Sequence, residues 1–190
     1  MLPVTLRLTS VLLATLALTL LAACHNPHEG EWLTAASGGT ANTTTEEAGG
    51  RTVVHASAAG ARWTIAGRCR QQGLITLDVD LTAGPAPLRV APDGFAMAVG
   101  NIRYRLDHVA DVTGVDVSRD PDHPAPRTLY TVDRPDRSEL DVPARQQRAL
   151  LVFFDQPTAE ADLLAQGREP VLTLPTLGEG AATPVRLRCG

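Results

Sequence analysis

The amino-acid sequence predicts an all-β fold, an antiparallel β-sandwich, for residues 51–190. Three observations lead to this prediction. Several short segments alternate apolar and polar residues with a period of two, which is typical of strands that bury one face. The 16 Gly and 14 Pro residues interrupt the chain too often for long helices. The alternating segments amount to about eight or nine short strands, a number that suits a sandwich.

The expected strands follow one another along the whole domain. They lie within residues 51–56, 61–66, 74–82, 95–106, 127–132, 149–154, 170–175 and 184–189. In LITLDVDLT, residues 74–82, the apolar side chains at odd positions would form one buried face. ALLVFF, residues 149–154, is apolar on both faces, which favours a central strand covered on both sides. AEADLLAQ, residues 159–166, predicts a short peripheral helix.

Residues 95–106, FAMAVGNIRYRL, predict a β-hairpin. The apolar residues occupy odd positions up to Val99 and even positions from Ile102, so the alternation changes phase at Gly100 and Asn101. A two-residue turn at these positions explains the change. The register that follows would set three pairs opposite each other: Val99 with Ile102, Met97 with Tyr104, and Phe95 with Leu106.

The composition argues against one class of partner. All 17 basic residues are Arg, the net charge is −4, and basic and acidic residues are interspersed along the chain. This pattern lacks the clustered positive charge of a nucleic-acid-binding surface. Hydrophobic residues make up 44% of the chain but aromatic residues only 4%. We therefore expect a core built mainly from Val, Leu, Ile and Ala.

Residues 1–23 have the form of a secretory signal peptide. Arg7 is the only charge before an apolar run that ends in small residues and is too short to span a membrane, which takes about 20 residues. The run ends in LAAC, residues 21–24, which resembles the lipobox of bacterial lipoproteins. The resemblance implies that the signal peptide is removed and that acyl chains such as palmitate on Cys24 hold the protein at the membrane. Because His25 stands where an Asp would favour the inner membrane, the resemblance implies the outer membrane of a Gram-negative bacterium, facing the periplasm.

Residues 24–50 are expected to form the lipidated Cys and a flexible tether. They are rich in Gly, Thr, Ser and Ala and lack a sustained apolar period. Trp32 and Leu33 are the large apolar residues of this segment, and we interpret them as an incidental pair. The folded domain would then begin at Arg51.

Cys69 and Cys189 are predicted to form a disulfide. If Cys24 carries lipid, these two cysteines remain as an even pair in a domain exported to an oxidising compartment. Two free structural thiols are the alternative. A redox-active pair is disfavoured because neither residue belongs to a CxxC motif.

The order of features in residues 60–190 resembles the telokin-like, immunoglobulin-fold domains of many secreted bacterial lipoproteins. The matching segments are LITLDVDLT (74–82), APLRVAPDGFAMAV (86–99) and LDVPARQQRALLVFFDQP (140–157). The sequence departs from immunoglobulin domains where Trp63 precedes Cys69, and from the polar turn of the family where Ala144 replaces Gly. The resemblance implies an immunoglobulin-like sandwich in an extracytoplasmic location and transfers no catalytic residues.

The sequence contains no GxSxG, HExxH, Walker or GxGxxG motif, so we predict neither an enzyme nor a cofactor. Two Pro-rich loops flank the expected strand 127–132, and loops of this kind suit recognition. The candidate binding residues in and beside them are Asp120, Asp122, His123, Arg127, Asp133, Arg134, Asp136 and Arg137. Acidic and Arg residues are interleaved there, which favours local ion pairs over a metal site.

Three functions fit these expectations. The leading one is a lipid-anchored, non-enzymatic binding or structural module with a protein partner in the cell envelope. The second is an immunity or inhibitor lipoprotein that neutralises a toxin or hydrolase in the periplasm, which the neighbouring genes would reveal. The third is a metal-binding carrier that uses the Asp and His loop, which metal analysis of the purified protein would test.

Overall fold

A computed structural model of the chain describes residues 31–38, 42–58, 60–69, 71, 73–115, 126–134, 139–156, 169–177 and 181–189. All of them belong to one compact unit, residues 31–190. The predicted signal peptide, Cys24 and the predicted helix 159–166 lie outside the described residues. In the parts of the chain that are described, no helix has both the length and the apolar character needed to cross a membrane.

The described residues form strands and one short 3-10 turn, η1 (Pro92–Gly94). The strands are β1 (Leu33–Ala35), β2 (Asn42–Ala48), β3 (Arg51–Ala58), β4 (Ala61–Ala66), β5 (Ile75–Ala83), β6 (Leu88–Val90), β7 (Ala96–Val99), β8 (Ile102–Asp111), β9 (Arg127–Thr131), β10 (Leu140–Val142), β11 (Gln147–Asp155), β12 (Pro170–Leu174) and β13 (Thr183–Cys189). The all-β, antiparallel prediction is therefore confirmed.

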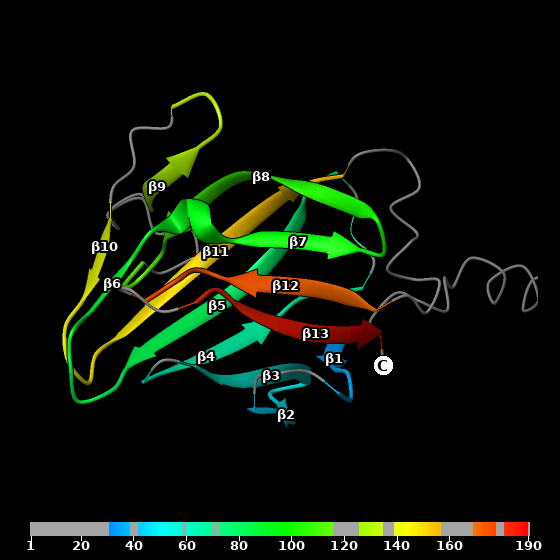
Figure 1. The fold of residues 1–190 in the computed structure, drawn as a ribbon, viewed down its shortest axis with the longest axis horizontal. Helices are drawn as coiled ribbons and strands as arrows, with labels where there is room; N and C mark the ends of the chain where they lie inside the picture. The colour runs from blue at the N-terminus through cyan, green and yellow to red at the C-terminus, as the bar shows by residue number, and fades with distance from the viewer. Residues whose placement is uncertain are drawn as a thin grey trace, which may run out of the picture. The chain divides into compact units, whose positions relative to one another are not determined.

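Most strands join one antiparallel sheet in the order β1-β13-β12-β7-β8-β11-β5-β4-β3-β2, with β9 added beside β8 and a separate β6-β10 pair (Figure 1). The first strand in this order also meets the far half of the sheet. Trp32 forms an antiparallel bridge with Arg68, and the Leu33 N–H donates to the Gly67 carbonyl at 2.9 Å. The sheet is therefore barrel-like, and its order does not clearly reproduce the two-sheet arrangement of immunoglobulin domains.

The core lies on the inner face of this sheet, and β5 shows why these residues form it. Ile75, Leu77, Val79 and Leu81 are all buried, as their alternation predicts. On the neighbouring β11, Leu150, Val152 and Phe154 are buried in the same way. The expectation that β11 is covered on both faces is wrong, because Leu151 and Phe153 on its outer face are only half-buried.

The hairpin formed by β7 and β8 has the predicted register. Val99 pairs with Ile102 and Met97 with Tyr104. Gly100 has φ +59°, the left-handed value that a two-residue turn with Gly at its first position requires. The turn, and with it the register, is thus fixed locally by the sequence.

The structure corrects the expected tether for residues 33–35 and 42–48. β1 and β2 occupy these positions, and Leu33 is fully buried in the core. Trp32 is not incidental either, since the Arg68 guanidinium lies over its ring, 4.8 Å from the centroid. The Leu33 side chain contributes the same burial free energy as any core leucine, which explains why this polar region is folded.

Replacing Leu33 with Ala is expected to lower the free energy of unfolding by about 3 kcal/mol, because it opens a cavity at a fully buried site. Urea unfolding followed by Trp fluorescence measures this loss. Thr34→Ala is the matched control, since Thr34 is the next residue but is only half-buried, and we expect a change of less than about 1 kcal/mol. Equal, small effects of both substitutions would mean that β1 is not part of the fold.

Cys69 and Cys189 form the predicted disulfide, with Cα atoms 5.7 Å apart. Cys69 follows β4 and Cys189 ends β13. Beside the bond, β1 pairs with β13 so that Leu33 lies opposite Cys189. The disulfide therefore reinforces the place where the sheet closes on itself.

Candidate functional site

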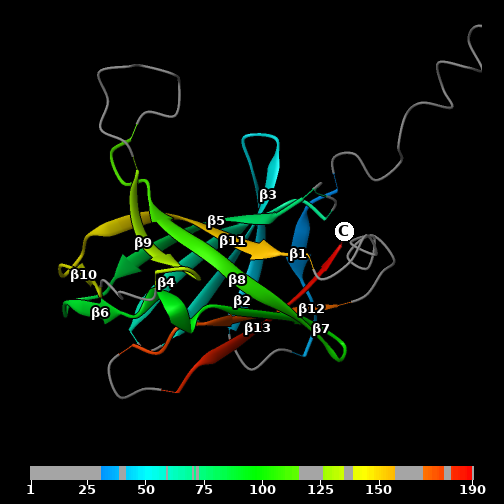
Figure 2. The ribbon, with the colours of Figure 1, turned by 90° about the horizontal axis from the view of Figure 1, so that it is seen from above.

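Of the candidate binding residues, the structure describes Arg127, Asp133 and Arg134. Arg127 is the first residue of β9, Asp133 and Arg134 follow the strand, and β9 pairs with β8 (Figure 2). The others lie outside the described residues: Asp120, Asp122, His123, Asp136 and Arg137. The candidate site therefore comprises β9, the turn after it, and the neighbouring parts of β8 and β11.

A β-bulge in β8 places two polar residues next to each other on the outer face. His108 pairs with Phe153 of β11, but the next pair is Leu106 with Phe154, so Asp107 is an extra residue. Leu106 and Val109 both point into the core, and Asp107 and His108 between them are half-buried. Bulges commonly redirect side chains in this way.

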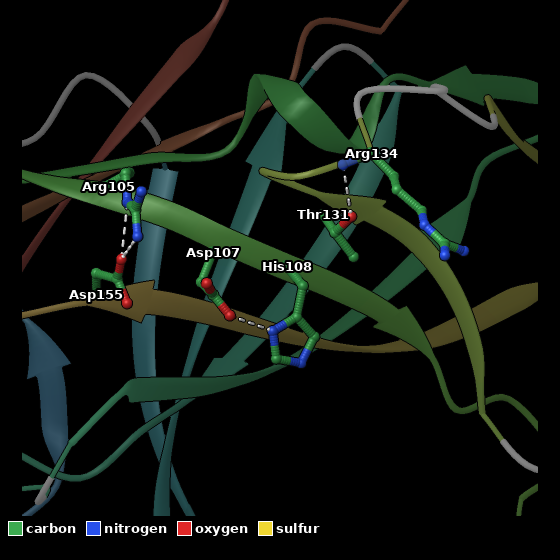
Figure 3. A network of polar contacts seen from close by, with 6 residues as sticks. All are labelled: Arg105, Asp107, His108, Thr131, Arg134 and Asp155. Carbon is green, nitrogen blue, oxygen red and sulfur yellow. Dashed lines mark hydrogen bonds and ion pairs between the residues drawn. The ribbon is translucent and has the colours of Figure 1, made fainter.

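The bulge holds the His108 ring in one orientation (Figure 3). Its Nδ1 lies 2.7 Å from Asp107 Oδ2, and because a carboxylate only accepts, Nδ1 is the donor. The ring also stacks on Phe153 of β11, with centroids 3.9 Å apart and an interplanar angle of 12°. No described group bonds to Nε2, so this nitrogen is available to a ligand.

A tight turn follows β9 and positions Asp133 and Arg134. The Arg134 N–H donates both to the Thr131 carbonyl at 3.2 Å and to Thr131 Oγ1 at 3.0 Å. Thr131 in turn pairs with His108 across the strands. An open pocket of about 500 Å³ runs along this region, lined by Thr128, Leu129, Tyr130, Thr131, Asp133 and Arg134. Arg134 and Asp133 are thus exposed charges at the edge of a pocket.

An ion pair forms the opposite border of this region. The Arg105 guanidinium donates through two nitrogens to Asp155 Oδ2 (Figure 3). This hydrogen bond, and next the charge of Asp155, raise the pKa of Arg105 above its usual value. The pair is largely exposed, so its contribution to stability is small. Its effect on the site is to fix where Arg105 lies.

We name the group Asp107, His108, Thr131, Arg134 and Phe153 the β8–β9 site. It offers an imidazole nitrogen, a guanidinium and a half-buried aromatic ring, and two of its members, Thr131 and Arg134, line the open pocket. These groups suit hydrogen bonds and charge pairing with a polar partner surface. Among the described residues, no three His, Cys, Asp or Glu side chains gather to hold a metal ion. Asp120, Asp122 and His123 lie outside the described residues, so the metal-binding alternative stays a prediction.

Sequence reasoning missed Asp107 and His108 as members of a site. The signal was present in LDHV, residues 106–109, where two polar residues stand between two apolar ones inside an otherwise strict alternation. Such a break in period is what a bulge produces, because the extra residue shifts the phase. The sequence placed Phe153 on a covered face of the strand at residues 149–154 and did not predict that it belongs to a site.

Comparisons with known proteins found no matching protein-family model, no matching curated protein and no matching solved structure.

Proposed function

We propose that this chain is a lipid-anchored lipoprotein of the bacterial cell envelope whose β-domain is a non-enzymatic binding or structural module of the telokin-like, immunoglobulin-like kind. The observation that supports it is how the three cysteines are divided. Cys69 and Cys189 are joined in a disulfide, which favours an oxidising, exported location. Cys24 is left over at the end of LAAC, which resembles the lipobox whose cysteine carries the acyl chains in bacterial lipoproteins.

The β8–β9 site is the surface we assign to the partner, which we take to be another envelope protein. Two features support this choice. The His108 ring is held by two contacts, so binding it costs little further side-chain entropy. Arg134 is exposed at the pocket edge, and Arg is enriched in protein interfaces.

The anchor is tested by acyl labelling. Cells that express the full chain are fed a labelled palmitate analogue, and the mass of the amino-terminal peptide is measured after purification. We expect label in the wild-type protein and none after Cys24→Ala, while the Cys69–Cys189 disulfide still forms. Label that persists in Cys24→Ala, or an unlabelled wild-type protein, contradicts the proposed anchor.

The partner is tested by site-specific crosslinking in living cells. A photoreactive amino acid replaces Arg134 or, as the control, Arg62, which is equally exposed on β4. This chemistry is needed because the chain contains no Lys for amine-reactive crosslinkers. We expect a discrete adduct from position 134 that disappears when His108 is also replaced by Ala. No adduct, or the same adducts from both positions, counts against a partner at this site.

A further inference from the structure

The outer face of β8, β7, β12 and β13 carries positive charge without matching acids. Arg103 on β8 and Arg186 and Arg188 on β13 are all exposed. β7, β12 and β13 contain no Asp or Glu. We call Arg103, Arg186 and Arg188 the basic strip.

The register sets the basic strip out across four neighbouring strands. Arg103 lies opposite Ala98, Ala98 opposite Val171, and Val171 opposite Arg186, in one row. In Figure 1, β7, β12 and β13 lie in the near layer. Because the residues between the two ends of the row are short, the guanidinium groups of the longer Arg side chains can extend beyond them.

The charges of the strip are not cancelled within the described residues. No ion pair there involves Arg103, Arg186 or Arg188. Their neighbour Arg105 differs, since Asp155 neutralises it. The other acids of β8 and its surroundings are Asp107, which bonds to His108, Asp111 at the far end of the strand, and Glu169 directly before β12. Within the described residues, the three guanidinium groups of the strip therefore have no acidic partner.

The proposed anchor is attached close to this face. Thr34 of β1 lies opposite Arg188, and its hydroxyl donates to the Arg188 carbonyl at 3.3 Å. Cys24 and Leu33 are only nine positions apart, and a fully extended chain of that length spans at most about 30 Å. If residues 24–50 were all tether, the domain could sit far from the bilayer. Because β1 is part of the sheet, the distance between the sheet and the bilayer is limited by the short segment between Cys24 and Leu33.

We propose that the basic strip lies against the anionic lipid head groups of the membrane that carries the anchor. The inference rests on the proposed lipid anchor, which supplies the proximity. Each Arg near an anionic bilayer strengthens binding about fivefold, so a short tether and a few arginines are enough to orient the domain. In that orientation the face of β13 and β12 is turned to lipid.

The unlipidated chain from His25 to Gly190 tests the strip apart from the anchor. It contains every described strand and both cysteines of the disulfide. Flotation measures its binding to vesicles of phosphatidylcholine alone and of phosphatidylcholine mixed with phosphatidylglycerol. Arg186→Gln with Arg188→Gln is compared with Arg62→Gln plus Arg89→Gln, which removes the same charge from exposed positions elsewhere. Circular dichroism confirms that both variants fold.

We expect stronger binding to the anionic vesicles, a loss of roughly 25-fold in the Arg186 and Arg188 variant, and less than a twofold change in the control. Added salt should weaken the binding. Equal binding to both vesicles, or equal losses in both variants, overturns the proposal. So does equally tight, strip-dependent binding to soluble heparin, which would show a general polyanion site. If Cys24 is labelled but the protein does not bind vesicles, the lipid-binding role of the strip is wrong and the proposed anchor is unaffected. If the protein binds anionic vesicles but Cys24 is not labelled, only the proposed anchor is wrong.

Discussion

Replacing Cys69 and Cys189 together with Ala is expected to lower the free energy of unfolding by roughly 4–5 kcal/mol. The bond joins residues 120 apart, so it removes much conformational freedom from the unfolded chain. The Cα atoms are 5.7 Å apart, within the usual range for disulfides. The effect should therefore come mainly from the unfolded state. Urea unfolding of the oxidised wild type and the double variant measures it.

Reduced wild-type protein is the control for the cysteine pair. It should unfold at nearly the same urea concentration as the double Ala variant, because both lack the same covalent closure. A loss below about 1 kcal/mol would mean that the pairing of β1 with β13 holds the sheet closed without the disulfide.

Replacing Trp63 with Ala is expected to cost about 3–5 kcal/mol of unfolding free energy. The side chain is fully buried and meets Phe95 edge-on, with ring centroids 6.0 Å apart. Its indole N–H has no hydrogen-bond partner among the described residues. Trp63→Phe removes that buried donor while keeping most of the ring, so we expect less than half the loss. Thermal and urea unfolding check both values.

Arg62→Ala serves as the matched control for Trp63, because the two residues are adjacent on β4 and Arg62 is exposed. Its effect should stay within about 0.5 kcal/mol. A cost for Arg62→Ala comparable to that of Trp63→Ala would show that β4 faces the core with its other side.

The parts of the fold that depend on local patterns could be predicted from the sequence. The β7–β8 turn depends on Gly100 and Asn101, and the inner face of β5 on a strict alternation of four apolar residues. The disulfide followed from counting the cysteines once Cys24 was set aside. Each of these inferences needs only a short window or a small set of residues.

The parts of the fold that depend on residues far apart in the sequence could not be predicted. β2, with the sequence NTTTEEA, has no apolar alternation because most of it is exposed at the end of the sheet order. Leu33 becomes a core residue through β13, at the other end of the chain, and through Gly67, which is also distant in sequence. In the β8–β9 site, Phe153 meets His108 through a register that the bulge at Asp107 shifts. Pairing between strands far apart in the sequence, and irregular register, produce only weak sequence signals.

The pairing of β1 with β13 also bears on how the protein is made. Thr34 and its neighbour Arg188 are 154 positions apart, so the first of the described strands to leave the ribosome waits for the last of them. Contacts of such long sequence separation slow folding. In the envelope lipoprotein that we propose, which would be exported amino terminus first, the sheet would stay open, and so export-competent, until the carboxy terminus emerged. Late closure of the barrel would thus serve as a natural delay between translocation and folding.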